Sequence, residues 1–402
     1  MKKINLTYKH TTVACFAGYV VQAVINNFVP LLFLTFESGY GIPLSKITLL
    51  VTINFAIQLT VDLLSASLID KIGYRVSVMA ADALSCVGLI FLAVLPEALP
   101  DPYVGLLIAV AVYAVGGGLL EVLVSPIVES CPTENKETTM SLLHSFYCWG
   151  HVGVVLLSTL FFTAFGTENW RILALIWAIV PALNLIMFRF VPIYSLGGEG
   201  ERGLKITELF KLPTFWLMML LMFAAGASEQ AVSQWASAFA EAGLGVSKTV
   251  GDLCGPLIFA FFMGSSRALY GKFGGSVNIK NMMLGSSALC ILSYLVISLS
   301  PWAAVSLVGC GICGFSVGIL WPGSFSISSS VIRGGGTALF AFLALAGDLG
   351  CTVGPTFVGL VSSAAGSSLS KGILASVVFP TVMLMGVILL KKRGKSRAEC
   401  RK

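Results

Sequence analysis

Long apolar stretches alternate with short polar gaps along the whole chain of 402 residues. A helix needs about 20 mostly apolar residues to cross the hydrocarbon core of a bilayer, and twelve stretches are long enough. They lie at about 11–36, 46–69, 76–95, 104–129, 138–165, 171–191, 213–240, 249–270, 280–299, 302–330, 337–363 and 371–390. This pattern predicts an all-α membrane protein with twelve transmembrane helices.

The longest polar gap divides the twelve predicted helices into six and six. It spans residues 193–212 and contains GGEGERGLK. We interpret it as a cytoplasmic linker between an N-terminal six-helix bundle, residues 1–192, and a C-terminal six-helix bundle, residues 213–402. The second bundle ends in a basic cytoplasmic tail.

The two predicted bundles share short sequence matches in the same order. The pairs are QAV (22–24 and 230–232), GIPLSK with GLGVSK (41–46 and 243–248), IDKIGYR with YGKFGGS (69–75 and 270–276), and GGGLLEVLVSP with FSVGILWPGSF (116–126 and 315–325). Four ordered matches indicate an internal duplication. Two six-helix halves with the same orientation predict parallel repeats packed about an axis along the membrane normal.

Composition and charge support the membrane assignment and set an orientation. Only 11% of residues are charged, against about 25% in soluble domains. With the N-terminus inside, the cytoplasmic segments hold 21 Lys and Arg and the outer loops hold 4, which predicts that both termini are cytoplasmic. We expect a multi-pass protein of the cell (inner or plasma) membrane. The basic tail is then a topology anchor near anionic lipid, and no nucleic-acid partner is needed.

The sequence gives no sign of an enzyme or of a metal protein. HExxH, GxSxG and paired catalytic aspartates are missing, and the loops are too short for a soluble domain. The three His and ten Cys have no zinc-binding or disulfide spacing. We therefore expect no catalytic residue, no metal and no cofactor.

Ionisable residues at membrane depth mark a cavity or a proton path, because burying them is costly. Those well inside the predicted spans are Asp62, Glu121, His144, His151, Glu229 and Asp348. No Lys or Arg is expected deep in any span, so nothing cationic would pair with these carboxylates. The same absence disfavours an anionic substrate. Glu121, His144, His151, Glu229 and Asp348 are the candidate proton-coupling residues.

The span at 138–165 carries two of these groups in one stripe. His144 and His151 are seven residues apart, which is nearly two helical turns, so both point the same way. Histidine titrates near neutral pH and can carry protons. The alternative is that each histidine hydrogen-bonds a neighbouring helix.

A polar and aromatic cluster predicts a site for a sugar or a similar solute. Glu229, Gln230, Gln234 and Trp235 lie together in the span at 213–240, and the related first span carries amides. Amides hydrogen-bond hydroxyl groups, and an aromatic ring stacks on the apolar face of a sugar. The alternative for each residue is interhelical packing. The candidate substrate-binding residues are Gln22, Asn26, Asn27, Tyr147, Trp149, Gln230, Gln234, Trp235 and Trp321.

Twelve helices in two halves, with the turn DKIGYR after the second, resemble the major facilitator superfamily over essentially the whole chain. The resemblance implies that this turn governs conformational change and does not bind substrate. It assigns that role to Asp70, Lys71, Gly73 and Arg75. Asp62 either joins them as a gate between the halves or contacts substrate.

Within the superfamily, the fourth helix resembles the fucose:proton symporter family, whose pattern G-x-G-x-x-E-x-x-x-(N)-P matches Gly116, Gly118, Glu121, Ser125 and Pro126. In the span at 213–240 the match is looser, at Gly226, Glu229 and Trp235. In the span at 138–165, His144 and Tyr147 align with two positions that face the sugar in that family. The chain departs from the family pattern in the span at 11–36, where Asn26 replaces the family's coupling aspartate and cannot titrate.

These features together predict a secondary active transporter for a neutral sugar or polyol, working by alternating access as a monomer in the lipid bilayer. Glu121 is the first choice for the proton-coupling residue. Because of Asn26, coupling through Glu229 or Asp348, sodium coupling and uncoupled transport stay open. The rivals are a multidrug or metabolite exporter of the same fold and a receptor without transport.

Overall fold

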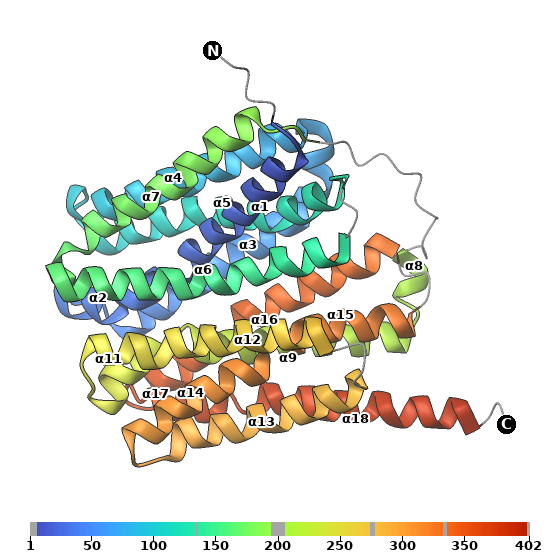
Figure 1. Cartoon of the computed structure of the whole chain (residues 1–402). Coiled ribbons are helices and arrows are strands. Elements are labelled where there is room, and N and C mark those ends of the chain that lie inside the picture. The colour runs from blue at the N-terminus through green and yellow to red at the C-terminus, as the bar shows by residue number, and fades with distance from the viewer. Residues whose placement is uncertain (1–5, 133–135, 194–205, 274–277, 333–335, 400–402) are drawn as a thin grey trace. The chain divides into compact units, whose positions relative to one another are not determined.

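The computed structural model describes residues 6–132, 136–193, 206–273, 278–332 and 336–399. All regular secondary structure within these ranges is helical (Figure 1). Twelve helical stretches in this part of the chain are long and apolar enough to cross a membrane, and each overlaps one predicted span. The prediction of an all-α, multi-pass membrane protein is confirmed.

The chain divides into two compact units, residues 1–198 and 199–402. The helices of the first unit are α1 (Tyr8–Asn27), the 3-10 turn η1 (Val29–Leu32), α2 (Phe33–Tyr40), α3 (Leu44–Ile72), α4 (Tyr74–Ala98), α5 (Pro102–Glu129), α6 (Lys136–Phe165), the 3-10 turn η2 (Thr167–Asn169) and α7 (Trp170–Phe190). Most of the predicted linker, residues 194–205, lies outside the described residues.

The second unit repeats six spans with more interruptions. Its helices are α8 (Ile206–Leu209), α9 (Pro213–Ser233), α10 (Ala236–Ala238), the π-helical η3 (Phe239–Gly243), α11 (Lys248–Asp252), the π-helical η4 (Leu253–Leu257), α12 (Ile258–Phe273), α13 (Ile279–Leu299), α14 (Ala303–Val317), α15 (Leu320–Val331), α16 (Gly336–Ala364), α17 (Leu369–Ala375) and α18 (Val378–Glu399). The side chains of the basic tail from residue 393 onward are outside the described part.

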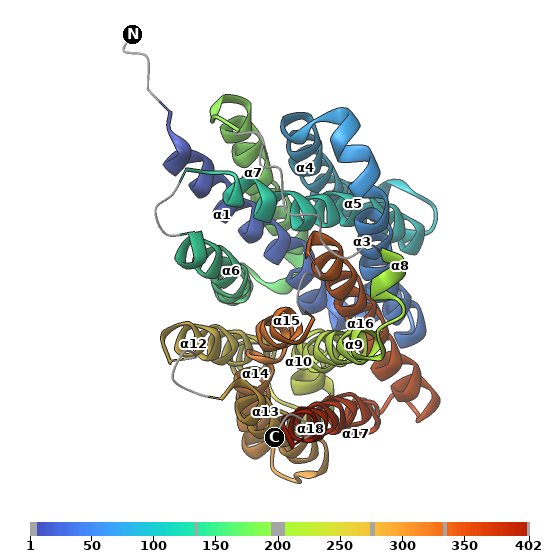
Figure 2. The ribbon, with the colours of Figure 1, turned by 90° about the vertical axis from the view of Figure 1, so that its right-hand side faces the viewer.

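The first long helix of each unit is its most covered one. The most apolar window is 83% buried in the stretch that begins with α1 and 72% in the stretch that begins with α9, above every other span. Helix α1 packs against α5, α6 and α7, and α9 packs against α16, α18 and α15 (Figure 2). Both helices are interrupted near the same point of the repeat, α1 after Asn27 and α9 after Ser233. Polar side chains on these two helices are therefore held inside their units.

Glycines let α4 and α5 approach to backbone contact. A Cβ on Gly88 would lie 2.5 Å from the backbone N of Tyr113, and one on Gly116 would lie 2.6 Å from the carbonyl oxygen of Ala81. Small residues at helix crossings are typical of membrane bundles, because packing between helices replaces the hydrophobic drive of water.

Helices α9 and α16 use the same device. Gly350 and Gly354 form a GxxxG motif on α16, which faces the backbone of Phe223 and Ala227 on α9. Gly226 on α9 in turn lies against the carbonyl of Gly347. This close crossing fixes the position of α9 and thus of Glu229, one turn further along.

We expect Gly350→Ala to destabilise the protein, because the added Cβ would lie 2.0 Å from the carbonyl oxygen of Phe223. Separating packed backbones costs about 1–3 kcal/mol, so the thermal unfolding midpoint should fall by several degrees. Gly285→Ala on α13 is the matched control, since its Cβ would meet nothing within 4 Å. Equal midpoints for the two variants would contradict the close crossing.

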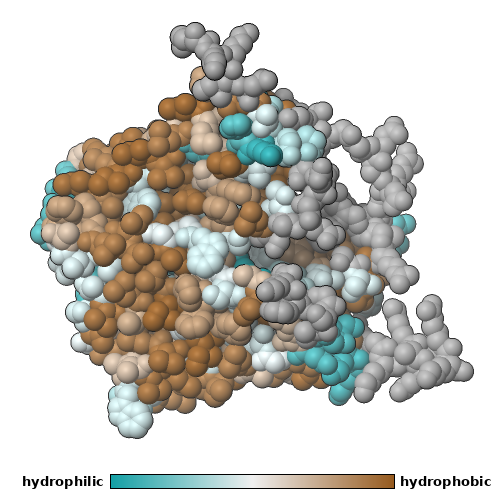
Figure 3. Space-filling model, in the orientation of Figure 1, coloured by the Kyte–Doolittle hydropathy of each residue, from teal (hydrophilic) through white to brown (hydrophobic). Residues whose placement is uncertain are grey.

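The surface of the spans is apolar, as lipid requires. Figure 3 shows hydrophobic residues over most of the visible face. Among the well-exposed side chains are Leu157, Leu160, Ile179, Leu183 and Leu292. This surface agrees with the membrane assignment.

Candidate functional site

The carboxylate of Glu121 meets the first helix of its unit. Gln22 on α1 is buried and donates a hydrogen bond from Nε2 to Glu121 Oε2 over 2.6 Å. Glu121 itself is half-buried. A neutral amide is thus one partner of this carboxylate.

The triple glycine before Glu121 explains how α5 reaches its neighbours. Gly116 lies against α4, Gly117 against Ile25 of α1, and Gly118 against the backbone of Gln58 on α3. Each of the three glycines meets a different helix, because successive residues are rotated by about 100°. These glycines therefore form the surface by which α5 packs on its neighbours.

One turn further along α1, a cluster of amides surrounds Asn26. Asn54 and Gln58 on α3 both donate to Asn26 Oδ1, over 3.1 Å and 2.8 Å. All three side chains are buried. Asn27 bonds back to the carbonyl of Ala23 on its own helix over 2.9 Å. The structure therefore brings Gln22 and Asn26 into one polar region with Glu121 and places Asn27 in a local backbone contact.

Two amide oxygens in this region have no hydrogen-bond donor in the described part of the chain. They are Gln22 Oε1 and Asn54 Oδ1, and both are buried. Buried amide oxygens almost always accept a hydrogen bond. We name Gln22, Asn26, Asn54, Gln58 and Glu121 the amide–carboxylate site.

His144 is joined to α1 and α5 through a tyrosine. Tyr19 on α1 hydrogen-bonds Ser125 Oγ on α5 over 3.1 Å and His144 Nδ1 on α6 over 3.3 Å. His144 is exposed, whereas His151 is only 2% exposed. The two histidines predicted to share a stripe therefore differ in their access to water.

The other candidates on α6 are more open. Tyr147 is half-buried and Trp149 is 43% exposed. Their roles in solute binding stay predictions.

In the second unit, Glu229 is paired with a cation, which corrects an expectation from the sequence. Arg267 Nη2 on α12 lies 3.1 Å from Glu229 Oε2, and both side chains are largely covered. Arg267 Nε also donates to the carbonyl of Gly318, where α14 ends, over 3.3 Å. The expectation that nothing cationic would pair with the intramembrane carboxylates was wrong, and the argument against an anionic substrate falls with it.

The error has a geometric cause. Arg267 lies near the end of its span and was counted with the cytoplasmic segment. Side chains on a helix lean toward its N-terminus, which for α12 is toward the middle of the membrane. The long side chain therefore reaches inward to Glu229.

The amides beside Glu229 continue this network. Gln230 Nε2 donates to Glu229 Oε1 over 3.4 Å, and Gln234 Nε2 donates to Gln230 Oε1 over 3.0 Å. Trp235 is fully buried and donates from its indole nitrogen to the carbonyl of Pro355 over 2.9 Å. A covered ring cannot stack on a solute in this conformation, so the predicted stacking would need Trp235 to be uncovered.

Trp321 and Asp348 lie next to the glycine crossing of α16. A Cβ on Gly347 would lie 2.2 Å from the ring of Trp321, so the ring packs on the helix backbone there. Asp348 is largely buried, and its carbonyl accepts a hydrogen bond from Thr352 over 3.0 Å. Neighbouring groups thus approach the backbone closely at the two glycines that flank Asp348, Gly347 and Gly350.

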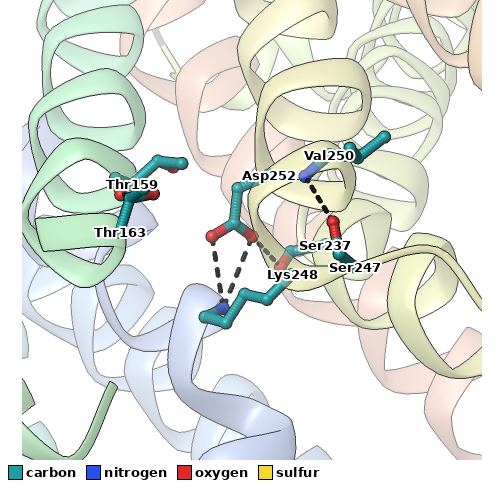
Figure 4. Close-up of polar contacts among 7 residues, drawn as sticks. All are labelled: Thr159, Thr163, Ser237, Ser247, Lys248, Val250 and Asp252. Atoms are coloured by element: carbon teal, nitrogen blue, oxygen red, sulfur yellow. Dashed lines mark hydrogen bonds and ion pairs between the residues drawn. The ribbon is translucent and has the colours of Figure 1, made fainter. Parts of the chain in front are cut away.

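A second cation–carboxylate pair lies in the second unit. Lys248 Nζ is 3.2 Å from Asp252 Oδ2, and Ser237 Oγ donates to Oδ1 of the same aspartate (Figure 4). The side chain of Asp252 is fully covered. Helix α11 is capped by Ser247, which accepts a hydrogen bond from the backbone N–H of Val250 over 3.4 Å. The ion pair lies within α11, and the hydrogen bond from Ser237 links α11 to α10, on the other side of the π-helical η3.

The turn between α3 and α4 ties its arginine to another helix. Arg75 donates to the carbonyls of Phe188, Arg189 and Val191 at the end of α7, over 2.6–3.2 Å. A cation is favourable there because the last carbonyls of a helix are unpaired and carry partial negative charge. Gly73 has φ +89°, which only glycine adopts readily.

The remaining gate candidates are less defined. Asp62 is half-buried on α3. The side chains of Asp70 and Lys71 lie outside the described part. The gating roles of Asp62, Asp70, Lys71, Gly73 and Arg75 stay predictions.

Asn54, Gln58 and Tyr19 were missed from the sequence. Asn54, Gln58 and Asp62 recur every four residues, so they lie on one side of α3. That spacing was a usable signal. Tyr19 had none, because a single tyrosine in an apolar span is ordinary.

Solved transporter structures share this fold. A bacterial homologue of the human lysosomal transporter Spinster, inward-facing and unoccupied, has TM-score 0.72 and 14% identity, covering 95% of this chain and 96% of its own. The proton:xylose symporter XylE, bound to 6-bromo-6-deoxy-D-glucose, has TM-score 0.75 and 13% identity, with 96% and 95% covered. The E. coli fucose:proton symporter FucP has TM-score 0.66 and 14% identity, with 95% and 99% covered.

These identities establish a common fold and nothing finer. No curated protein matches the chain by sequence. Residues 12–355, most of the chain, match the model of the Major Facilitator Superfamily. Fold and family together define a multi-pass membrane transporter. The chain belongs to the major facilitator superfamily, whose members are generally carriers and not enzymes.

Proposed function

We propose that this transporter carries a small neutral polar solute, a sugar or polyol, by secondary active transport coupled to protons through Glu121. The observation that supports this most is the pair of buried amide oxygens, Gln22 Oε1 and Asn54 Oδ1, that lack a donor in the described part of the chain. A solute hydroxyl is the donor such an oxygen accepts. Two of the structures that share the fold are titled as proton symporters of xylose and of fucose.

Charge in the second unit is compatible with a neutral solute. The guanidinium of Arg267 is already balanced by Glu229, so this pair adds no net charge. The two carboxylates have different partners. The guanidinium of Arg267 contacts Glu229, and the amide of Gln22 contacts Glu121, to which we assign the coupling proton.

In the proposed cycle, Glu121 takes a proton from outside and the solute binds at the amide–carboxylate site. A bare carboxylate in a closed, dry cavity is penalised by several kcal/mol. Neutral Glu121 removes this cost, so the loaded carrier can close and reopen inward. Release of the solute and the proton to the cytoplasm resets it.

A stabilisation screen of the purified protein tests the solute class. Sugars, polyols, nucleosides, sugar acids and cationic dyes are compared at two pH values, with and without sodium. We expect a neutral sugar or polyol to raise the unfolding midpoint, because a ligand at about 100 times its Kd adds about 2.7 kcal/mol to stability.

The matched variants are Asn54→Leu, which should lose at least half of the shift, and Asn281→Leu, an exposed amide on α13 that should keep it. Stabilisation by dyes and not by sugars would favour an exporter. Stabilisation by sugar acids alone would overturn the neutral solute.

A further inference from the structure

One helical turn from the Gln22–Glu121 contact, a second polar contact joins the same two helices, α1 and α5. Tyr19 lies three residues before Gln22 on α1, and Ser125 lies four residues after Glu121 on α5. Residues at these spacings are neighbours on one helix face. The two helices are therefore linked by two side-chain hydrogen bonds one turn apart, Gln22–Glu121 and Tyr19–Ser125. His144 of α6 also hydrogen-bonds Tyr19.

We propose that Tyr19 and Ser125 relay the proton between Glu121 and His144, and that this relay is its exit to the cytoplasm. The relay rests on the proposed function, in which Glu121 binds and releases a proton. It adds Tyr19, which no sequence pattern singled out, gives Ser125 a role in proton transfer, and gives the proton a direction.

The direction follows from where the three helices begin and end. The predicted topology places the start of α1, the end of α5 and the start of α6 on the cytoplasmic side. Tyr19 lies between the start of α1 and Gln22, and Ser125 lies between Glu121 and the end of α5. His144 is closer to the start of α6 than His151 is. All three therefore lie on the cytoplasmic side of Glu121, and His144 is exposed.

The chemistry of the relay balances without any further reagent. Protonated Glu121 gives its proton to Ser125 Oγ, the Ser125 hydroxyl proton passes to Tyr19, and the Tyr19 phenol proton passes to His144 Nδ1. The net change is a carboxylate at Glu121 and an imidazolium at His144. Hydroxyl groups donate and accept at once, and imidazole titrates close to neutral pH, so His144 can give the proton to water.

Two of the three transfers follow contacts seen in the structure, and the third needs only a movement of the Glu121 side chain. The contacts of Tyr19 with Ser125 and with His144 are 3.1 Å and 3.3 Å. Glu121 and Ser125 are one turn apart, about 5–6 Å between their Cβ atoms, which is within reach of the flexible glutamate side chain. The titratable groups on α1 and on the helices packed against it include Cys15, Asp82, Cys131, Tyr147, Cys148 and His151. Of these, Asp82 is held by Asn184 on α7, over 3.1 Å and 3.2 Å.

The test follows the proton itself and needs no solute. Membrane vesicles enriched in the full-length protein receive a rapid acid pulse, and the carboxylic acid C=O stretch is recorded by infrared difference spectroscopy. In inside-out vesicles the pulse reaches the cytoplasmic side, and in right-side-out vesicles it reaches the other. The band that Glu121→Gln removes reports protonation of Glu121.

We expect Tyr19→Phe to slow this band at least tenfold in inside-out vesicles and to leave its final amplitude and its rate in right-side-out vesicles unchanged. Ser125→Ala should behave the same way and serves if Tyr19→Phe does not fold. The control is Tyr113→Phe, which changes a buried tyrosine on α5 far along the helix from Ser125. This variant should keep the wild-type rate.

The outcomes separate the two proposals. If Glu121→Gln removes no band, coupling through Glu121 is wrong. If the band is present and both relay variants form it at the wild-type rate in inside-out vesicles, the relay is wrong and the coupling residue stands.

Discussion

Glu121→Gln is expected to abolish accumulation of the solute against its gradient in proteoliposomes, while exchange of solute across the membrane continues. With one proton per solute, each unit of pH difference can sustain about a tenfold concentration ratio, since one pH unit and a tenfold ratio are both about 1.4 kcal/mol. Glutamine keeps the hydrogen-bonding shape next to Gln22 but cannot lose a proton. The accumulation ratio should therefore fall to about 1 at any pH gradient.

The control for this variant is Glu97→Gln, which neutralises an exposed carboxylate at the end of α4 that is paired with Arg171. It should accumulate solute as the wild type does. Radiolabelled solute counts at imposed pH gradients measure both variants. Undiminished uphill uptake by Glu121→Gln would show that the proton binds elsewhere, with Asp348 as the next candidate.

Arg267→Leu is expected to destabilise the protein strongly, because it leaves Glu229 as an uncompensated buried charge. Removing one partner of a buried pair costs about 3–5 kcal/mol. It also frees the carbonyl of Gly318 at the end of α14. The thermal unfolding midpoint in detergent should fall by several degrees.

The double variant Glu229→Leu/Arg267→Leu should recover most of this loss, since it leaves no buried charge. Arg171→Leu is the matched control, because Arg171 and Glu97 are 40% and 52% exposed and such a pair contributes about 0–1 kcal/mol. Equal losses for Arg267→Leu and Arg171→Leu would mean that the Glu229–Arg267 pair is not buried as described.

The spans were predictable because a spanning helix is recognised by length and hydropathy along one dimension. Each of the twelve predicted stretches overlaps an observed one, and the ends differ by a few residues. The glycines near Glu121 were also predictable as packing residues, since a small residue in an apolar span has few other uses.

The partners of the polar residues were not predictable, because they depend on which helix faces which. Glu121 is contacted by Gln22 from 99 positions earlier, and Glu229 by Arg267 from 38 positions later. Neither spacing carries a signal along the chain. Asn26 is the clearest case, because the sequence shows only that it cannot titrate. The structure adds that it is the acceptor shared by Asn54 and Gln58.

Proton movement driven by the solute tests the central claim most directly. Proteoliposomes are loaded with a pH-sensitive dye, and the solute selected by the stabilisation screen is added outside at equal starting pH. We predict that the lumen acidifies as the solute enters, about one proton for each molecule, and that Glu121→Gln takes up solute without acidification. Entry of radiolabelled solute into wild-type liposomes with no change in lumen pH would contradict the account.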